Sequence, residues 1–97
     1  MTVRVALVQL DCSMSEPVAD RVARTLTLID AVAPDVDMLI LPELWQTGAF
    51  DIDAARAHAE SIDGPIVSAL GALAAQHSVW LHGGSICERG DDGQNYN

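Results

Sequence analysis

The sequence predicts an α/β fold in which a mostly parallel sheet carries helices on one face. Three apolar runs, at residues 3–10, 37–41 and 78–87, are typical of strands buried within a sheet. Segments with helical signals separate these runs, and such alternation predicts parallel strands joined by right-handed crossovers. With 97 residues, of which 49% are apolar, the chain has room for one small domain with an aliphatic core.

A helix is predicted after the first apolar run, between two prolines. Pro17 suits the first turn of a helix, with Ser15 or Glu16 near its cap, and Pro34 stops the helix. An apolar stripe follows at helical spacing: Val18, Val22, Leu26 and Ile29. The charged residues of this helix are expected to lie largely off the stripe: Asp20, Arg21, Arg24 and Asp30.

The second strand, residues 37–41, is expected to end at Pro42, which has no N–H group to donate to a ladder. A loop over residues 43–50 follows. Either Asp51 or Asp53 can then cap a short alanine-rich helix that extends to about residue 60.

A second long helix and a final strand complete the predicted order. Gly64 ends the preceding helix, and Pro65 opens a helix that reaches about residue 76. The third strand, residues 78–87, leads into a polar turn at residues 88–93. Residues 94–97 then resemble the start of a returning strand.

The strands are apolar on both faces, but the predicted helices suffice to cover only one face. The other face therefore requires a partner layer that these residues do not contain. We accordingly expect the chain to be the amino-terminal part of a larger protein.

Charge and composition exclude several classes of partner. Fourteen acidic residues against five arginines, with no lysine, give a net charge of −9, which argues against nucleic acid or an anionic membrane as partner. No apolar run is long enough to span a membrane. The two cysteines form no spaced framework, so we expect a cytoplasmic protein with reduced thiols.

Glu43 is the strongest candidate for chemistry. It follows Pro42 at the carboxyl end of an apolar strand, where open α/β sheets place their functional groups. Its neighbours Leu44 and Trp45 are expected to exclude water from the carboxylate, which suits a general base. The alternative is an ordinary loop glutamate near the edge of the sheet.

Other candidates are weaker. Residues 11–17 contain no glycine, so the first turn lacks the glycine-rich backbone whose amides could approach the phosphates of a nucleotide. The Gly83-Gly84 pair opens no helix and instead indicates a bulge or a close approach of chains. Cys12 has acidic rather than basic neighbours and Cys87 closes an apolar strand, so both are expected to be structural.

The three histidines, His58, His77 and His82, do not share metal-ligand spacing. We therefore expect no metal site and no cofactor. His82, beside the glycine pair, is expected to be a hydrogen-bonded histidine of the core or rim.

Taken in order, the motifs resemble the nitrilase superfamily of carbon–nitrogen hydrolases. Residues 5–9 (Val-Ala-Leu-Val-Gln) resemble its opening strand, and residues 39–44 (Leu-Ile-Leu-Pro-Glu-Leu) its first catalytic motif. Residues 81–88 (Leu-His-Gly-Gly-Ser-Ile-Cys-Glu) resemble its Gly-Ser-x-x-Glu strand, and residues 94–97 (Gln-Asn-Tyr-Asn) the start of the next strand. The Gly64-Pro65 pair before the second long helix also fits.

The resemblance implies the amino-terminal half of a four-layer α-β-β-α sandwich. It also implies a thiol hydrolase that cleaves non-peptide C–N bonds of a small amide, nitrile or N-carbamoyl compound with a Glu-Lys-Cys triad. Of that triad only the general base carries over, onto Glu43. Residues 1–97 are thus expected to be a partial domain that stops before the catalytic lysine and cysteine and is inactive alone, from a homo-oligomeric parent.

An alternative from a different class stays open. The chain could be a non-catalytic α/β interaction module that pairs through its exposed sheet face or its unfinished edge, because such surfaces favour association.

Overall fold

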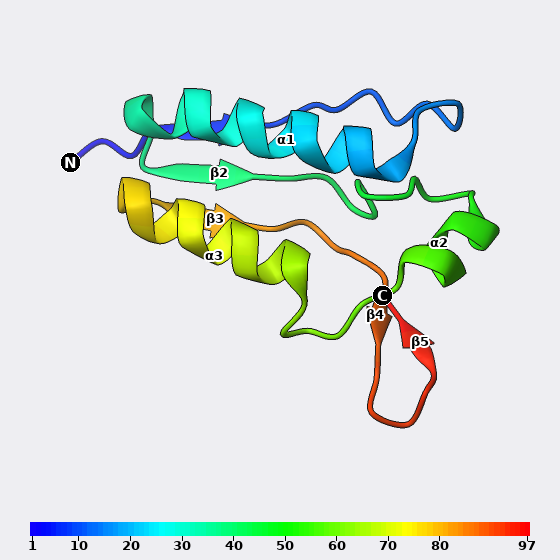
Figure 1. The fold of residues 1–97 in the computed structure, drawn as a ribbon. Helices are drawn as coiled ribbons and strands as arrows, with labels where there is room; N and C mark the ends of the chain where they lie inside the picture. Colours follow the sequence, from blue (N-terminus) through cyan, green and yellow to red (C-terminus); the bar gives the residue numbers. More distant parts are fainter.

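The computed structural model describes residues 1–97 and contains a three-stranded parallel sheet of order β1-β2-β3 (Figure 1). The sheet strands are β1 (Val5–Leu7), β2 (Met38–Ile40) and β3 (Trp80–His82). Helices α1 (Val18–Val32) and α3 (Pro65–His77) pack on one face of the sheet, and the shorter α2 (Ile52–His58) lies beyond the carboxyl ends of the strands. The predicted order of elements and the parallel sheet are confirmed.

Each strand is shorter than predicted, and the early end of the central strand limits the carboxyl ends of all three. The ladder closes where the amide of Leu41 donates to the His82 carbonyl at 2.9 Å, immediately before Pro42. On the other side, the last bond runs from the amide of Val8 to the Ile40 carbonyl, also at 2.9 Å. Beyond this level Pro42 offers no donor, so the flanking strands lose their partner.

The two faces of the sheet differ completely in their surroundings. Ala6, Leu39 and Leu81 share one level of the register and pack toward the helices, where Leu39 is fully buried. The opposite face, here called the open sheet face, consists of six side chains: Val5, Leu7, Met38, Ile40, Trp80 and His82. Leu7 is 73% exposed and Trp80 is 77% exposed. The predicted bare face is confirmed, whereas burial of the strands on both faces does not occur within this chain.

Helix α1 buries a residue that its apolar pattern does not predict. Its buried side chains are Arg21, Thr25 and Ile29, with Arg21 only 1% exposed. Val22 and Leu26 pack at the edge of the core. The expectation that Arg21 lies off the buried side is therefore wrong, because polar partners on neighbouring loops make burial of the guanidinium tolerable.

The ends of α1 and the following turn differ in detail from the prediction. Pro17 itself is the N-cap residue, and its carbonyl accepts from the amides of Asp20 and Arg21 at 3.1 Å. No side chain caps this end, so the capping role predicted for Ser15 or Glu16 is wrong. After Val32 the chain tightens into the 3₁₀ turn η1 (Ala33–Asp35), which contains Pro34.

The starts of α2 and α3 follow the predicted signals, but α2 ends at His58, so the prediction that Gly64 ends this helix is wrong. Asp51 caps α2, accepting from the amide of Ala54 at 3.0 Å. Gly64 precedes α3, where a Cβ would lie 2.8 Å from the Ser61 carbonyl oxygen. The Glu60 carboxylate accepts from the amide of Ile66 at 2.6 Å and thereby supports the first turn of α3.

A short hairpin completes the chain. Strands β4 (Glu88–Arg89) and β5 (Asn95–Tyr96) pair antiparallel, which confirms the returning strand (Figure 1). The first two residues of the predicted turn belong to β4. No helix in the structure combines the length and apolar composition that crossing a bilayer requires.

Candidate active site

Glu43 opens a tight turn, residues 43–47, at the carboxyl end of β2. The turn is closed by a 2.8 Å hydrogen bond from the amide of Gly48 to the Leu44 carbonyl. The Glu43 side chain is exposed, so the predicted shielding by its neighbours is wrong. Trp45 is instead buried in the core, where its indole N–H donates to the Gly83 carbonyl at 2.9 Å.

The residue after Glu43 has an unusual backbone conformation. Leu44 has φ of +48°, in the left-handed region that few residues other than glycine adopt. Its amide donates to the Ser85 hydroxyl at 3.0 Å. Such strain persists where the surroundings enforce it, often at functional sites. Leu44 and Ser85 therefore fix the direction in which the backbone leaves Glu43.

Gly84 supports the turn from the segment that follows β3. Its φ is +65°, and a Cβ at this position would lie 1.9 Å from the Pro42 carbonyl oxygen. Only glycine allows this approach of the segment after β3 to the residue before Glu43. The predicted close approach of chains at the glycine pair is thus confirmed.

Two shallow cavities meet at Glu43. One, of about 300 Å³, is lined by six residues: Leu41, Glu43, His82, Gly84, Ser85 and Asn97. The other, of about 330 Å³, is lined by seven: Cys12, Met14, Glu43, Gly48, Ala49, Phe50 and Asp51. The amide group of Asn97 donates to Glu43 Oε1 at 3.3 Å. The carboxylate is therefore accessible to a molecule bound on either side of it.

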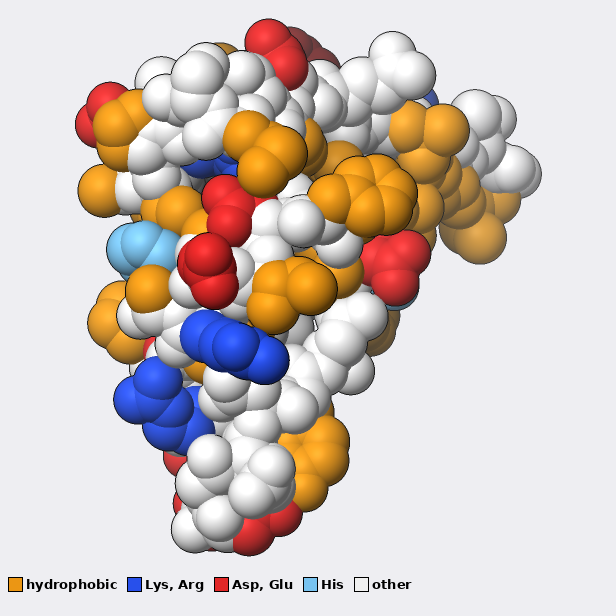
Figure 2. All heavy atoms as spheres, turned by 90° about the vertical axis from the view of Figure 1, so that its right-hand side faces the viewer, with side chains coloured by type: hydrophobic (Ala, Val, Ile, Leu, Met, Phe, Trp, Pro, Cys, Tyr) orange, Lys and Arg blue, Asp and Glu red, His pale blue; other side chains and the backbone are white.

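Figure 2 views the molecule from the carboxyl ends of the strands. Hydrophobic and acidic side chains lie close together on the upper part of this face, basic side chains lie lower, and further acidic side chains lie at the bottom. This face therefore combines exposed apolar area with side chains of both charges.

The other sequence candidates lie in structural positions. The Cys12 thiol faces the Trp45 carbonyl at 3.9 Å, and Cys87 is buried with its sulfur 4.0 Å from the Thr47 hydroxyl. His82 is exposed at the rim, where Nδ1 accepts from the amide of Gly84 at 3.2 Å. This confirms the predicted role of His82 as a hydrogen-bonded rim histidine.

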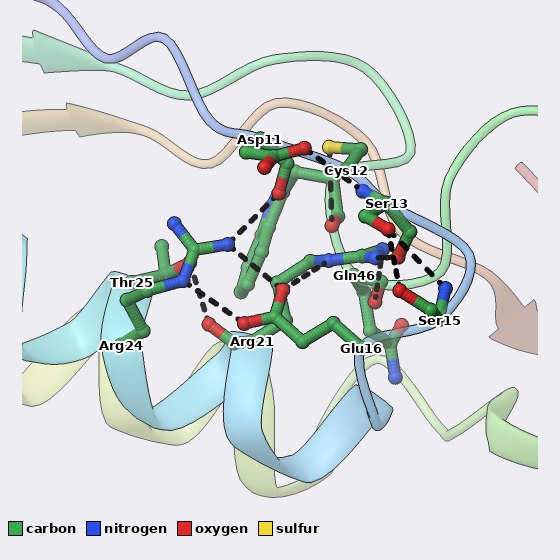
Figure 3. Close-up of polar contacts among 10 residues, drawn as sticks. Asp11, Cys12, Ser13, Ser15, Glu16, Arg21, Arg24, Thr25 and Gln46 are labelled. Atoms are coloured by element: carbon green, nitrogen blue, oxygen red, sulfur yellow. Dashed lines mark hydrogen bonds and ion pairs between the residues drawn. The ribbon is translucent and has the colours of Figure 1, made fainter.

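The structure adds a charged cluster that sequence reasoning missed (Figure 3). Buried Arg21 contacts Glu16 at 3.1 Å and the Gln46 carbonyl at 3.3 Å, and it also donates to the Ser13 carbonyl. Arg24 donates to both carboxylate oxygens of Glu16, and these bonds hold the pKa of the Glu16 carboxyl below its ordinary value. No apolar pattern signals such a cluster. A Gly-Ser pair after β3 could have indicated the support that Ser85 gives.

The geometry permits proton transfer at Glu43. An exposed carboxylate on a constrained turn can accept a proton from a group bound in either cavity. The sequence contains no lysine, and no arginine lines either cavity, so these residues offer no cationic group beside Glu43.

Comparison with known proteins agrees with the motifs and the fold. The carbon–nitrogen hydrolase family matches residues 4–97. The 2-oxoglutaramate amidase of Paenarthrobacter nicotinovorans is 35% identical over 82 residues, which are 84% of this chain and 28% of that protein. The crystal structure of XC1258 from Xanthomonas campestris, a CN-hydrolase superfamily protein with an arsenic adduct in its active site, superposes with a TM-score of 0.79 at 28% identity.

That superposition covers 98% of this chain and 34% of XC1258, so the chain spans about a third of the length of the proteins that it matches. The match over almost every residue, together with the parallel sheet and the ordered motifs, gives one conclusion. The chain belongs to the carbon–nitrogen hydrolase family.

Proposed function

We propose that residues 1–97 supply Glu43 as the general base of an enzyme that hydrolyses the C–N bond of a small amide. The observation that carries this proposal is the position of Glu43: an accessible carboxylate between two cavities, on a turn held by Leu44, Ser85 and Gly84. The similarity to an amidase favours an amide over a nitrile or an N-carbamoyl compound.

In the proposed reaction, Glu43 takes the proton of a cysteine thiol, and the sulfur attacks the amide carbon. A lysine ammonium stabilises the oxyanion of the tetrahedral intermediate. The intermediate collapses to a thioester as the amine leaves with the proton that Glu43 returns. Glu43 then takes a proton from a water molecule, whose oxygen attacks the thioester carbon. The C–S bond breaks, the acid leaves, and Glu43 returns the proton to the thiolate.

The lysine and the nucleophile are proposed to lie outside residues 1–97. These residues contain no lysine. Cys87 is buried beside Thr47, and the Cys12 thiol faces a backbone carbonyl, so neither is assigned as the nucleophile. The proposed domain is accordingly a partial one, and the 97-residue chain alone should not turn over an amide.

The test uses the enzyme at its full encoded length. Glu43→Gln keeps the shape of the side chain but removes the base, so kcat/KM for a small amide should fall by roughly 10²- to 10⁴-fold with an unchanged melting temperature. Asp53→Asn is the matched control, because it makes the same chemical change on an exposed side chain of α2. Activity of Glu43→Gln within tenfold of the wild type would refute the role of Glu43.

A second candidate rests on the open sheet face, where Leu7 and Trp80 are largely exposed. Two copies of the chain could pair through this face as a non-catalytic interaction module. Sedimentation of the 97 residues distinguishes the two candidates. A defined dimer that Trp80→Glu dissociates would favour the module, whereas heterogeneous aggregation favours part of an enzyme.

Two properties of the whole enzyme are also proposed. The unpaired thiols of Cys12 and Cys87 support a reducing, cytoplasmic location. The family resemblance supports a homo-oligomer, which sedimentation of the full-length protein would test.

A further inference from the structure

A buried guanidinium joins the two loops that flank the second cavity beside Glu43. Arg21 Nη2 donates to the Ser13 carbonyl in the loop after β1, and Nη1 donates to the Gln46 carbonyl in the turn that begins at Glu43 (Figure 3). The two carbonyls belong to segments 33 residues apart in sequence. Arg21 is thus the side chain that connects these segments directly from α1.

We propose that Arg21 is a positioning residue for Glu43, acting by fixing the turn at residues 43–47 against the loop at residues 11–16. This inference rests on the proposed role of Glu43 as general base. Cys12 and Met14 of the loop line the same cavity as Glu43. Arg21 therefore holds together two of the segments that border this cavity.

The chemistry of the contact requires arginine. A planar guanidinium presents donors in fixed directions, so one group can bind two carbonyls and a carboxylate at once. The third contact is Arg21 Nε to Glu16 at 3.1 Å, which compensates the buried charge. Arg24 holds Glu16 from the solvent side, at 2.8 Å, and also donates to the Asp11 carbonyl at 2.8 Å. The loop is thereby bound to α1 at several points.

The turn is held on its other sides by independent contacts. The Leu44 amide bonds the Ser85 hydroxyl, and the Gln46 side chain donates to the His58 carbonyl at the end of α2 at 3.1 Å. These bonds restrain the beginning of the turn and its side toward α2. Only Arg21 restrains the backbone of Gln46 from the side of α1. Its loss should therefore release one side of the turn while the rest of the fold persists.

The experiment compares Arg21→Met and Arg21→Lys with two controls in the full-length enzyme. Methionine keeps most of the apolar stem but has no donor, and lysine keeps the charge without the planar fork. Arg4→Met makes the same change at the opposite end of the sheet, where Arg4 is exposed and lies 3.9 Å from Asp37. Ile29→Ala destabilises α1 from within the core and removes no hydrogen bond to either loop.

Steady-state kinetics on a small amide and hydrogen exchange measured by mass spectrometry are the readouts. Arg21→Met should lower kcat by roughly tenfold to a hundredfold with KM within about twofold, since a small displacement of a catalytic group has effects of this size. Exchange should accelerate at residues 11–16 and 43–48 alone. Arg21→Lys should recover part of kcat, Arg4→Met should match the wild type, and Ile29→Ala should lower the melting temperature without the local change.

Three results would overturn the inference. The first is a kcat for Arg21→Met that is no lower than the kcat of Ile29→Ala. The second is an increase in hydrogen exchange of Arg21→Met that spreads over the whole domain. The third is an Arg21→Lys variant that has wild-type exchange but shows the full loss of kcat. If Arg21→Met does not fold, Arg21→Lys decides by the same readouts. An inactive Glu43→Gln beside a fully active Arg21→Met refutes this inference alone, whereas an active Glu43→Gln refutes the proposed function.

Discussion

The carbonyl oxygen of Pro42 lies against the α carbon of Gly84, so closely that a Cβ on residue 84 would be 1.9 Å from that oxygen. Because Glu43 directly follows Pro42, the position of the carboxylate depends on a residue of the neighbouring chain segment. The conformation of Gly84, with φ of +65°, adds a second reason for glycine at this position.

We expect Gly84→Ala to destabilise the fold by at least about 2 kcal/mol, because it combines left-handed strain with an impossible contact. Chemical denaturation measures the change. Gly93 has φ of +78° but open space around it, so Gly93→Ala should show the strain alone, about 1 kcal/mol. Gly71 lies within α3 with nothing near its Cβ position, and Gly71→Ala should stabilise by about 0.5–1 kcal/mol. Equal effects of the three substitutions would contradict this account of Gly84.

The cap of α2 gives a second prediction. Asp51 accepts from the amide of Ala54, so Asp51→Ala should cost about 1 kcal/mol of unfolding free energy and Asp51→Asn much less. Asp53 lies in the first turn but makes no cap bond, so Asp53→Ala should cost clearly less. Asp51 also lines the second cavity, so fraying of α2 should also alter substrate binding in that cavity. A loss at Asp53 as large as that at Asp51 would count against the cap.

The third prediction concerns pH. Hydrogen bonds from Arg24, and then from Arg21, hold the pKa of the Glu16 carboxyl below its ordinary value. In the unfolded chain the group binds a proton at higher pH, so the stabilisation is fully present above the unfolded pKa of about 4.3 and is lost as pH falls through the folded pKa. The melting temperature of Glu16→Gln should therefore fall further below that of the wild type at pH 7 than at pH 3.

Asp20→Asn is the control for this pH series, because Asp20 makes no ion pair although it lies in the first turn of the same helix. The difference in melting temperature between Asp20→Asn and the wild type should change less between pH 7 and pH 3 than the difference for Glu16→Gln. A deficit of Glu16→Gln that stays constant over this range would show that packing, rather than charge, explains the contribution of Glu16.

Local signals in the sequence predict much of this fold. The apolar runs identify all three parallel strands, and Pro17, Asp51 and Pro65 mark helix starts to within a residue or two. The strands are shorter than their apolar runs because the end of a ladder depends on the partner strand. Pro42, not the composition of residues 3–10 or 78–87, limits the carboxyl ends of all three strands.

The candidate site could be predicted only in part. The Pro-Glu pair after an apolar strand identifies Glu43, but its exposure depends on where Trp45 finds room in the core. The role of Arg21 depends on two carbonyls and a carboxylate that only the folded chain brings together. Periodicity classifies such a residue as a surface cation.

The long-range bonds of the Glu43 turn have a consequence for the order of folding. Leu44 bonds Ser85, which lies 41 residues later, and Trp45 bonds Gly83, which lies 38 residues later. As the ribosome extends the chain, Glu43 emerges well before the residues that hold its turn in place. The entropy lost in closing such long loops must be offset before their contacts can form, so contacts between distant residues tend to form late. We therefore expect the carboxylate to reach its final position only after α3 and β3 have docked, so the site should form late in folding.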